Sequence, residues 1–163
     1  MPTASFTIRA ATEADVALLL EFIRGIAEYE KLLHEVVATE EGVRESLFGD
    51  SAVAEALIAE CEGEPAAFAV YFYNFSTFMG WRGLYLEDLF VKPKFRRRGI
   101  GEALLRHLAR QAVERGCRRF EWVVLDWNQS AIDFYQELGA EAMEGWQLFR
   151  ISGEKLKNLA MKR

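Results

Sequence analysis

The chain has 163 residues and a mass of 18.6 kDa, and 51% of its residues are hydrophobic. This is the size of one ordinary domain with enough apolar material for a buried core, which excludes disordered, collagen-like and low-complexity proteins. The net charge is −5, yet residues 92–98 contain five bases, and removing those five from the total leaves −10. An acidic body with one basic spot argues against nucleic-acid binding and favours a localised anion site, with a cationic second ligand.

The sequence shows no signal for export or membrane insertion. The N-terminus lacks the basic start and apolar stretch of a secretory signal, and no segment has the roughly 20 apolar residues of a membrane-spanning helix. Cys61 and Cys117 lie far apart and fit neither a disulfide framework nor a zinc site. We therefore expect a cytoplasmic protein with no metal and no nucleic-acid or membrane partner.

In chain order, the first expected elements are a strand at 6–10 and an amphipathic helix. Thr12 and Asp15 form a capping pair, and the apolar residues that follow recur at helical spacing as far as about Lys31. A second helix is expected at 39–48, where Thr39 is a suitable cap.

The middle of the chain predicts a hairpin followed by a strand-helix-strand unit. The apolar runs 53–61 and 66–73 flank a turn with Gly and Pro, which is typical of a hairpin. A further apolar run at 84–91 predicts a strand, 99–115 an amphipathic helix and 120–125 another strand.

The C-terminal part predicts a helix at 129–138, capped by Asn128, and a last strand at 146–151 before a short charged helix. The chain has no repeat, linker or composition break, so we expect one domain over residues 1–163. A hairpin followed by a crossover predicts an α/β fold with a single mixed sheet and helices on both faces.

The basic segment continues into Arg-Arg-Arg-Gly-Ile-Gly at 96–101, directly after a strand and at the start of a helix. Its glycines allow backbone N–H groups to approach a ligand, and the helix start offers free donors and partial positive charge to an anion. Its arginines would neutralise phosphates. Leu104 stands where a dinucleotide-binding loop requires Gly, and no Walker sequence occurs.

Arg96-x-x-Gly99-x-Gly101 after a strand resembles the acetyl-CoA pyrophosphate loop of the GNAT superfamily of N-acyltransferases. Segments 85–91, 126–135, 144–146 and 27–32 extend the match over nearly the whole chain. Together they resemble the diamine acetyltransferase subfamily, which includes the spermidine/spermine and thialysine N-acetyltransferases. The Trp-Asn-Gln triplet within 126–135 leans toward the thialysine enzymes. The resemblance implies the GNAT fold, whose mostly antiparallel sheet binds acetyl-CoA between two splayed central strands, and a homodimer.

The resemblance also implies which residues bind acetyl-CoA. In the family, the strand before the loop pairs with the pantetheine arm through its backbone, and the loop binds the pyrophosphate. The expected cofactor-binding residues are Leu89, Phe90, Val91, Arg96, Arg97, Arg98, Gly99, Ile100, Gly101, Glu102, Asn128, Ser130 and Ala131. An alternative role for Asn128 is that of a helix cap alone.

Acetyl transfer from a thioester to an amine needs a neutral amine and a proton for the leaving thiolate. Holding an alkylammonium with a pKa of ~10.4 neutral at pH 7 costs roughly 4.6 kcal/mol, so either a base or an already populated free amine is required, and a carboxylate can take the proton directly or through water. Glu87 and Asp88 interrupt the apolar strand, and as strand neighbours they are expected to face opposite ways. The resemblance assigns amine binding and proton removal to Glu87, with Asp88 the weaker candidate; a structural ion pair is the alternative for each.

Tyr135 follows Asn128 by seven residues, about two helical turns, and therefore shares its face. A phenol with a pKa of ~10 suits donation to a thiolate, and the resemblance makes this tyrosine the general acid. The alternative is an aromatic side chain that fills the core. For the amine, the resemblance implies Tyr29, Glu30, Glu87, Glu144 and Trp146.

The sequence thus predicts an acetyl-CoA-dependent N-acetyltransferase that modifies a primary amine of a small cationic substrate by direct transfer in a ternary complex. The expected acceptor is a thialysine-like lysine analogue, a diamine or a polyamine. Glu121 and Trp122 replace the family's residues near the polyamine channel, so polyamine selectivity is not carried over. The alternatives are a protein lysine or N-terminal acetyltransferase and a non-catalytic acyl-CoA-binding sensor.

Overall fold

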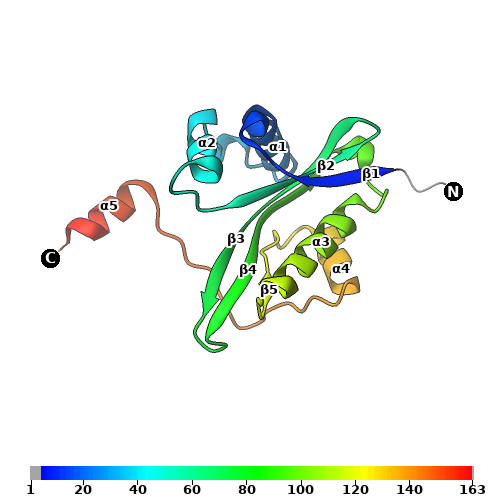
Figure 1. Cartoon of the computed structure of the whole chain (residues 1–163). Helices are drawn as coiled ribbons and strands as arrows, with labels where there is room; N and C mark the ends of the chain where they lie inside the picture. Colours follow the sequence, from blue (N-terminus) through cyan, green and yellow to red (C-terminus); the bar gives the residue numbers. More distant parts are fainter. Residues whose placement is uncertain (1–4, 163) are drawn as a thin grey trace. The chain divides into compact units, whose positions relative to one another are not determined.

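The computed structural model describes residues 5–162 and divides the chain into two compact units, one up to Leu125 and one from Asp126 onward (Figure 1). The first unit contains the sheet and the helices that cover it. Its elements are β1 (Phe6–Ala10), α1 (Val16–Tyr29), α2 (Glu40–Phe48), β2 (Glu55–Cys61), β3 (Glu64–Ser76), β4 (Trp81–Val91), α3 (Ile100–Glu114) and β5 (Phe120–Glu121).

The strands form one sheet in the order β1-β2-β3-β4-β5. The first four are antiparallel neighbours, and β5 lies parallel to β4, so the predicted mixed sheet is confirmed. The β4–β5 ladder joins only Leu84 to Phe120 and Tyr85 to Glu121. From Leu86 to Val91, β4 therefore has an edge with no ladder partner among the described residues, as expected where two central strands splay.

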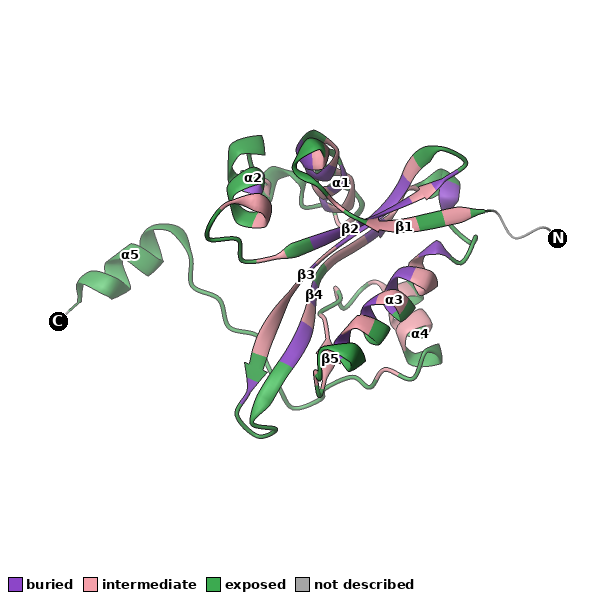
Figure 2. Cartoon of the chain, in the orientation of Figure 1, coloured by how far each residue is buried: buried purple, intermediate pink, exposed green. Residues whose placement is uncertain are grey.

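Helices cover both faces of the sheet, as the sequence predicts: α1 and α2 lie on one face and α3 on the other (Figure 1). Under α1, the ring of Phe22 stacks on that of Phe68 at 5.0 Å between centroids. On the other face α3 buries an apolar stripe in which Leu104 and Leu108 have no exposed surface. Figure 2 shows this burial running along the middle of the sheet and the helix faces that contact it.

The predicted caps of α1 and α2 are confirmed. The Thr12 N–H donates to Asp15 Oδ2 at 2.8 Å ahead of α1, and Lys31 adopts a φ of +62° just after the helix ends. The Gly42 N–H donates to Thr39 Oγ1 at 3.1 Å, which caps α2. These side chains satisfy backbone donors that a helix start leaves open, so local sequence fixes the helix boundaries.

Two strand predictions are wrong: one strand is shorter than expected and the other does not form. The strand expected at 120–125 is limited to β5, and the strand expected at 146–151 does not form. A strand requires a ladder partner, and the sheet supplies none to these residues within the described part of the chain. Apolar pattern alone therefore predicted more strand than pairing supports.

The second unit contains α4 (Gln129–Glu137) and α5 (Gly153–Met161). Asn128 caps α4, as predicted. Among residues 5–162, no helix combines the length and apolar character needed to cross a membrane.

Candidate acetyltransferase site

The loop between β4 and α3 presents backbone donors to open space. Arg97 and Gly99 have φ values of +60° and +79°, and Gly99 is the N-cap of α3. Within the described residues, no backbone carbonyl accepts a hydrogen bond from the N–H groups of residues 97–102. A side chain added at Gly99 would meet no atom within 4 Å. The loop therefore offers a series of free backbone N–H groups at the start of a helix, an arrangement that suits an anion.

Two predicted cofactor-binding residues in the first turn of α3 have side chains committed elsewhere. Ile100 is buried in the core with 1% of its surface exposed. The Glu102 carboxylate accepts from Arg106 at 2.7 Å. Both residues can therefore offer a ligand only their backbone N–H groups, which are the groups that the helix start leaves free.

Four of the five bases at 92–98 contact other protein groups. Lys92 pairs with Glu21 at 3.0 Å, and Lys94 pairs with Glu64. Arg96 and Arg98 also have partners: Arg96 contacts Val91, Tyr29 and Phe90, whereas Arg98 contacts Glu62, Cys61 and Phe95. In the part of the chain that the structure describes, Arg97 makes no hydrogen bond, ion pair or ring contact.

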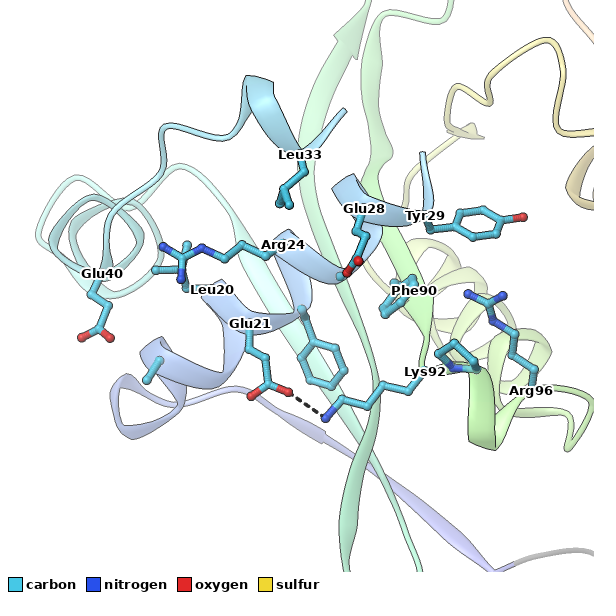
Figure 3. Close-up of a pocket in the computed structure, with 14 residues that line it drawn as sticks. Leu20, Glu21, Arg24, Glu28, Tyr29, Leu33, Glu40, Phe90, Lys92 and Arg96 are labelled. Carbon is cyan, nitrogen blue, oxygen red and sulfur yellow. Dashed lines mark hydrogen bonds and ion pairs between the residues drawn. The ribbon is translucent and has the colours of Figure 1, made fainter. Parts of the chain in front are cut away.

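A groove of about 650 Å³ lies along α1, between that helix and the end of β4 (Figure 3). Tyr29 and Arg96 lie at one end, where the Arg96 guanidinium is 4.7 Å from the Tyr29 ring centroid. Tyr29 is 39% exposed. A residue predicted for the amine and a residue predicted for the cofactor are thus neighbours, although they come from α1 and from the loop after β4.

An acidic group consists of Glu87 and Asp88 of β4 and of Glu30, which directly follows α1. Asp88 is half-buried, and burial, followed by the charges of Glu87 and Glu30, raises its pKa to about 6. Burial also raises the pKa of Glu30. Because the charges of Glu87 and Glu30 both act on Asp88, this part of the molecule has a negative potential that favours a cation.

The alternation expected for Glu87 and Asp88 does not hold, because β4 contains a β-bulge at this point. Val70 of β3 pairs with Asp88 and the next residue, Tyr71, pairs with Leu86, so Glu87 has no opposite residue. A bulge re-aims side chains and is common next to active sites. Two adjacent acids inside an apolar strand were the only sequence signal of this irregularity.

The last residues of β4 alternate between the two faces. Leu89 and Val91 are the nearest side chains to Gly101 of α3, whereas Phe90 packs toward α1. A Cβ at Gly25 of α1 would lie 2.9 Å from Phe90 Cε1, so α1 approaches this strand closely. Sequence reasoning missed Gly25, although a glycine within a helical pattern signals such an approach.

The remaining predicted residues belong to the second unit. Asn128 Oδ1 accepts from the Ala131 N–H at 3.4 Å and from the Ser130 hydroxyl at 3.3 Å, so Asn128 at least caps α4. Tyr135 is half-buried, with its ring 5.5 Å from that of Phe134. Two residues predicted for the amine, Glu144 and Trp146, are exposed.

Comparison with known proteins identifies the family of the chain. The Acetyltransferase (GNAT) family matches residues 23–140. Thialysine N-epsilon-acetyltransferase from Sus scrofa is 41% identical over 170 residues, covering 98% of this chain and 99% of the relative. An integron cassette protein from Vibrio cholerae superposes with a TM-score of 0.81 at 26% identity, covering 97% of this chain and 99% of that one.

A second solved structure, an aminoglycoside N-acetyltransferase in complex with CoA, has a TM-score of 0.73 at 19% identity and covers 93% of this chain and 98% of that one. This likeness concerns the fold. The family match spans most of the chain and includes β4, the donor-rich loop and α4. The chain therefore belongs to the GNAT acetyltransferase family and is an amine N-acetyltransferase.

Proposed function

We propose that the chain transfers the acetyl group of acetyl-CoA to the primary amine of a small cationic acceptor: a thialysine-like lysine analogue first, then a diamine or polyamine. The acidic group of Glu30, Glu87 and Asp88 is the observation that carries this proposal. Three carboxylates suit an ammonium group, and Tyr29, which precedes Glu30 in the chain, offers an exposed aromatic ring that also attracts a cation. The name of the Sus scrofa relative supports thialysine as the first acceptor to test.

The loop after β4 fits the phosphates of acetyl-CoA. Its free N–H groups at 97–102 and the open space at Gly99 suit a phosphate held at a helix start. The unpaired edge of β4 at Leu89, Phe90 and Val91 suits an extended chain with amide groups. Acetyl-CoA supplies an acetyl group that its thioester activates. In the second unit, Asn128, Ser130 and Ala131 are proposed to bind acetyl-CoA, because segment 126–135 resembles the family.

Glu87 is the proposed group that takes the proton from the acceptor ammonium, directly or through water. Its carboxylate is exposed and makes no ion pair with any residue at 5–162, and the bulge places Glu87 outside the regular ladder. Asp88 and Glu30 contribute charge that holds the ammonium nearby. A neutral amine is needed for attack, so a base that lowers the cost of deprotonation raises kcat.

Tyr135 is the proposed acid that protonates the leaving thiolate. A phenol retains its proton at pH 7 and is therefore ready to donate it. This role rests on the resemblance of segment 126–135 to the family and on the capped helix that carries the tyrosine. Proton removal by Glu87 and proton donation by Tyr135 balance the transfer, in which a C–N bond forms and the C–S bond breaks.

The deciding experiment is an assay of coenzyme A release from acetyl-CoA near pH 8. The acceptor panel holds thialysine, lysine, putrescine, spermidine, spermine and a lysine-bearing peptide. We expect a preference for one small amine, and Glu87→Gln should lower its kcat by about 100-fold. Glu114→Gln, which changes an exposed glutamate at the end of α3, is the matched control and should have wild-type activity.

Each other outcome points to a specific alternative. A preference for the peptide would favour a protein lysine acetyltransferase and overturn the small-amine proposal. Binding of acetyl-CoA without turnover on any acceptor would favour a non-catalytic sensor. Both results would leave the family assignment unchanged, because that rests on the match at 23–140.

We further propose that the chain acts as a single N-acetyltransferase domain over residues 1–163, as a homodimer in the cytoplasm. The family match at 23–140 extends across both compact units, which supports one functional domain. Two free cysteines fit a reducing compartment. A monomeric mass in light scattering would refute the dimer.

A further inference from the structure

The three consecutive arginines at 96–98, in the loop between β4 and α3, differ in the parts of the molecule that they contact. Arg96 Nε donates to the Val91 carbonyl at 2.9 Å, and its guanidinium carbon lies 4.7 Å from the ring centroid of Tyr29 and 5.5 Å from that of Phe90. Figure 3 shows Arg96 extending toward the Tyr29 ring at the end of α1. A planar guanidinium stacked on aromatic faces is held in one orientation. Arg96 therefore ties the loop to α1.

Arg98 contacts the β2–β3 hairpin instead. Its Nη1 donates to Glu62 Oε1 at 3.0 Å and lies 3.8 Å from the sulfur of the buried Cys61. Its guanidinium carbon is 5.5 Å from the Phe95 ring centroid. With 35% of its side chain exposed, Arg98 is the more enclosed partner of the Glu62 ion pair. The loop is thus attached to the protein on either side of Arg97.

Arg97 differs from both neighbours in conformation and contacts. Its φ of +60° is a left-handed conformation, which is unfavourable for a residue with a side chain. Its guanidinium has no partner in the described part of the chain. Backbone strain of this kind concentrates at ligand-binding loops, where the surrounding structure imposes it.

We propose that Arg96 and Arg98 are positioning residues, which fix the loop to α1 and to the β2–β3 hairpin respectively. Of the three arginines, Arg97 alone supplies side-chain charge to a phosphate of the acyl-CoA substrate. The sequence predicts that all three arginines neutralise phosphates. If Arg96 or Arg98 turned toward a ligand, it would break the hydrogen bond, ion pair or ring contacts that hold it. Arg97 can turn toward a ligand without breaking any such contact with the described residues. The proposal rests on the acyl-CoA-binding role of the loop, not on the identity of the acceptor.

The first test titrates coenzyme A into wild type and Arg97→Gly by calorimetry at several salt concentrations. Glycine removes the charge and relieves the strained backbone. Kd should weaken by about 10-fold, its dependence on salt should fall, and Tm should rise by about 2–4 °C. A residue with a purely structural role would not combine weaker binding with higher stability. An unchanged Kd would overturn the role of Arg97.

The second test reverses the ion pair of Arg98. Arg98→Glu should weaken coenzyme A binding, and adding Glu62→Arg should restore Kd to within about three-fold of wild type, because the pair forms again with its charges exchanged. If Arg98 contacted a phosphate directly, the double variant would not regain affinity, because position 98 would still hold a carboxylate, which repels the phosphate. A failure of the double variant to recover affinity, while it remains folded by circular dichroism, would therefore overturn the positioning role.

The third test uses Tyr29, which lies on the amine side of the site. Tyr29→Leu should weaken coenzyme A binding by about three-fold, although tyrosine at this position is proposed for the acceptor. Arg96→Lys keeps the charge but loses the stacking, so it should weaken Kd by a similar factor, and the two changes together should be less than additive. Wild-type affinity in both single variants would overturn the positioning role of Arg96.

Lys94→Met is the control for all three tests. It removes one base from the same segment, but that lysine pairs with Glu64 on the exposed surface, so Kd for coenzyme A should stay within about two-fold of wild type. These titrations need no acceptor. If coenzyme A binds but no amine is acetylated, the proposed acceptor fails and the roles of the arginines are still decided.

Discussion

Asp88 lies opposite Val70 in the β3–β4 ladder, whereas the next pair joins Leu86 to Tyr71, so Glu87 is an extra residue in β4. The resulting β-bulge disturbs a strand that is otherwise apolar and regular. Burial and the nearby charges of Glu87 and Glu30 raise the pKa of Asp88 to about 6. The acidic group that we propose for the acceptor therefore gains charge between pH 5 and pH 7.

Acceptor affinity should follow this ionisation. As Asp88 loses its proton, its negative charge strengthens attraction of the cationic amine, so KM for thialysine should fall several-fold from pH 5 to pH 7.5. Asp88→Asn should have a higher KM at pH 7.5 and a nearly flat profile. The comparison is made on KM because deprotonation of the amine itself, with a pKa of ~10.4, acts on kcat across the same range. Parallel KM profiles for the two proteins would remove Asp88 from acceptor binding.

The same substitution should stabilise the fold at alkaline pH. The pKa of Asp88 is higher in the folded state than the ordinary value of 3.8, so its ionisation destabilises the fold as pH rises from about 4 to 6, and the full loss is present above 6. Asp88→Asn avoids this loss, which after solvent screening is about 1–2 kcal/mol. Thermal melts should show a higher Tm than wild type at pH 8 and a difference that shrinks toward pH 4. A lower Tm for Asp88→Asn than for wild type at pH 8 would contradict this prediction.

Removal of the Tyr135 hydroxyl should act on the chemical step. Tyr135→Phe should lower kcat by about 100-fold with little change in the Kd of acetyl-CoA, as expected for a group that acts in the transition state. Tyr73→Phe is a matched control, since the Tyr73 hydroxyl accepts from Gln111 Nε2 at 2.8 Å in the first unit. Steady-state kinetics and calorimetry measure the two quantities. Unchanged turnover in Tyr135→Phe would exclude the tyrosine from the mechanism.

Local sequence was sufficient to predict the helices and the hairpin. The side chains of Asp15 and Thr39 accept from backbone N–H groups near helix starts, and apolar spacing marks the faces of α1 and α3. The arginine run and the two glycines between an expected strand and an expected helix located the loop at the start of α3. These features depend on residues close together in the chain, so their patterns are visible without knowledge of the fold.

The bulge, the partners of the loop bases and the missing strand could not be predicted in this way. The position of Glu87 depends on the register of β4 against β3, and the contact of Arg96 with Tyr29 joins residues 67 positions apart. The apolar pattern at 146–151 indicates a strand, but a strand forms only where another strand pairs with it. Each of these features is set by tertiary contacts, which a one-dimensional pattern does not contain.

The close approach of α1 to β4 gives the last prediction. A Cβ at Gly25 would lie 2.9 Å from Phe90 Cε1, and Phe90 is only 8% exposed, so its ring has little room to move. Alanine gains about 1 kcal/mol of helix propensity over glycine, but overpacking of a core costs about 1–3 kcal/mol. Gly25→Ala should therefore lower the free energy of unfolding by about 1 kcal/mol in urea titrations, and adding Phe90→Leu should lessen that penalty. Gly42→Ala is the control in α2, where the nearest atom is Thr39 Oγ1 at 3.3 Å, and it should be neutral or stabilising. Equal stability gains in both alanine variants would show that α1 and β4 are not packed as tightly as the contact at Phe90 requires.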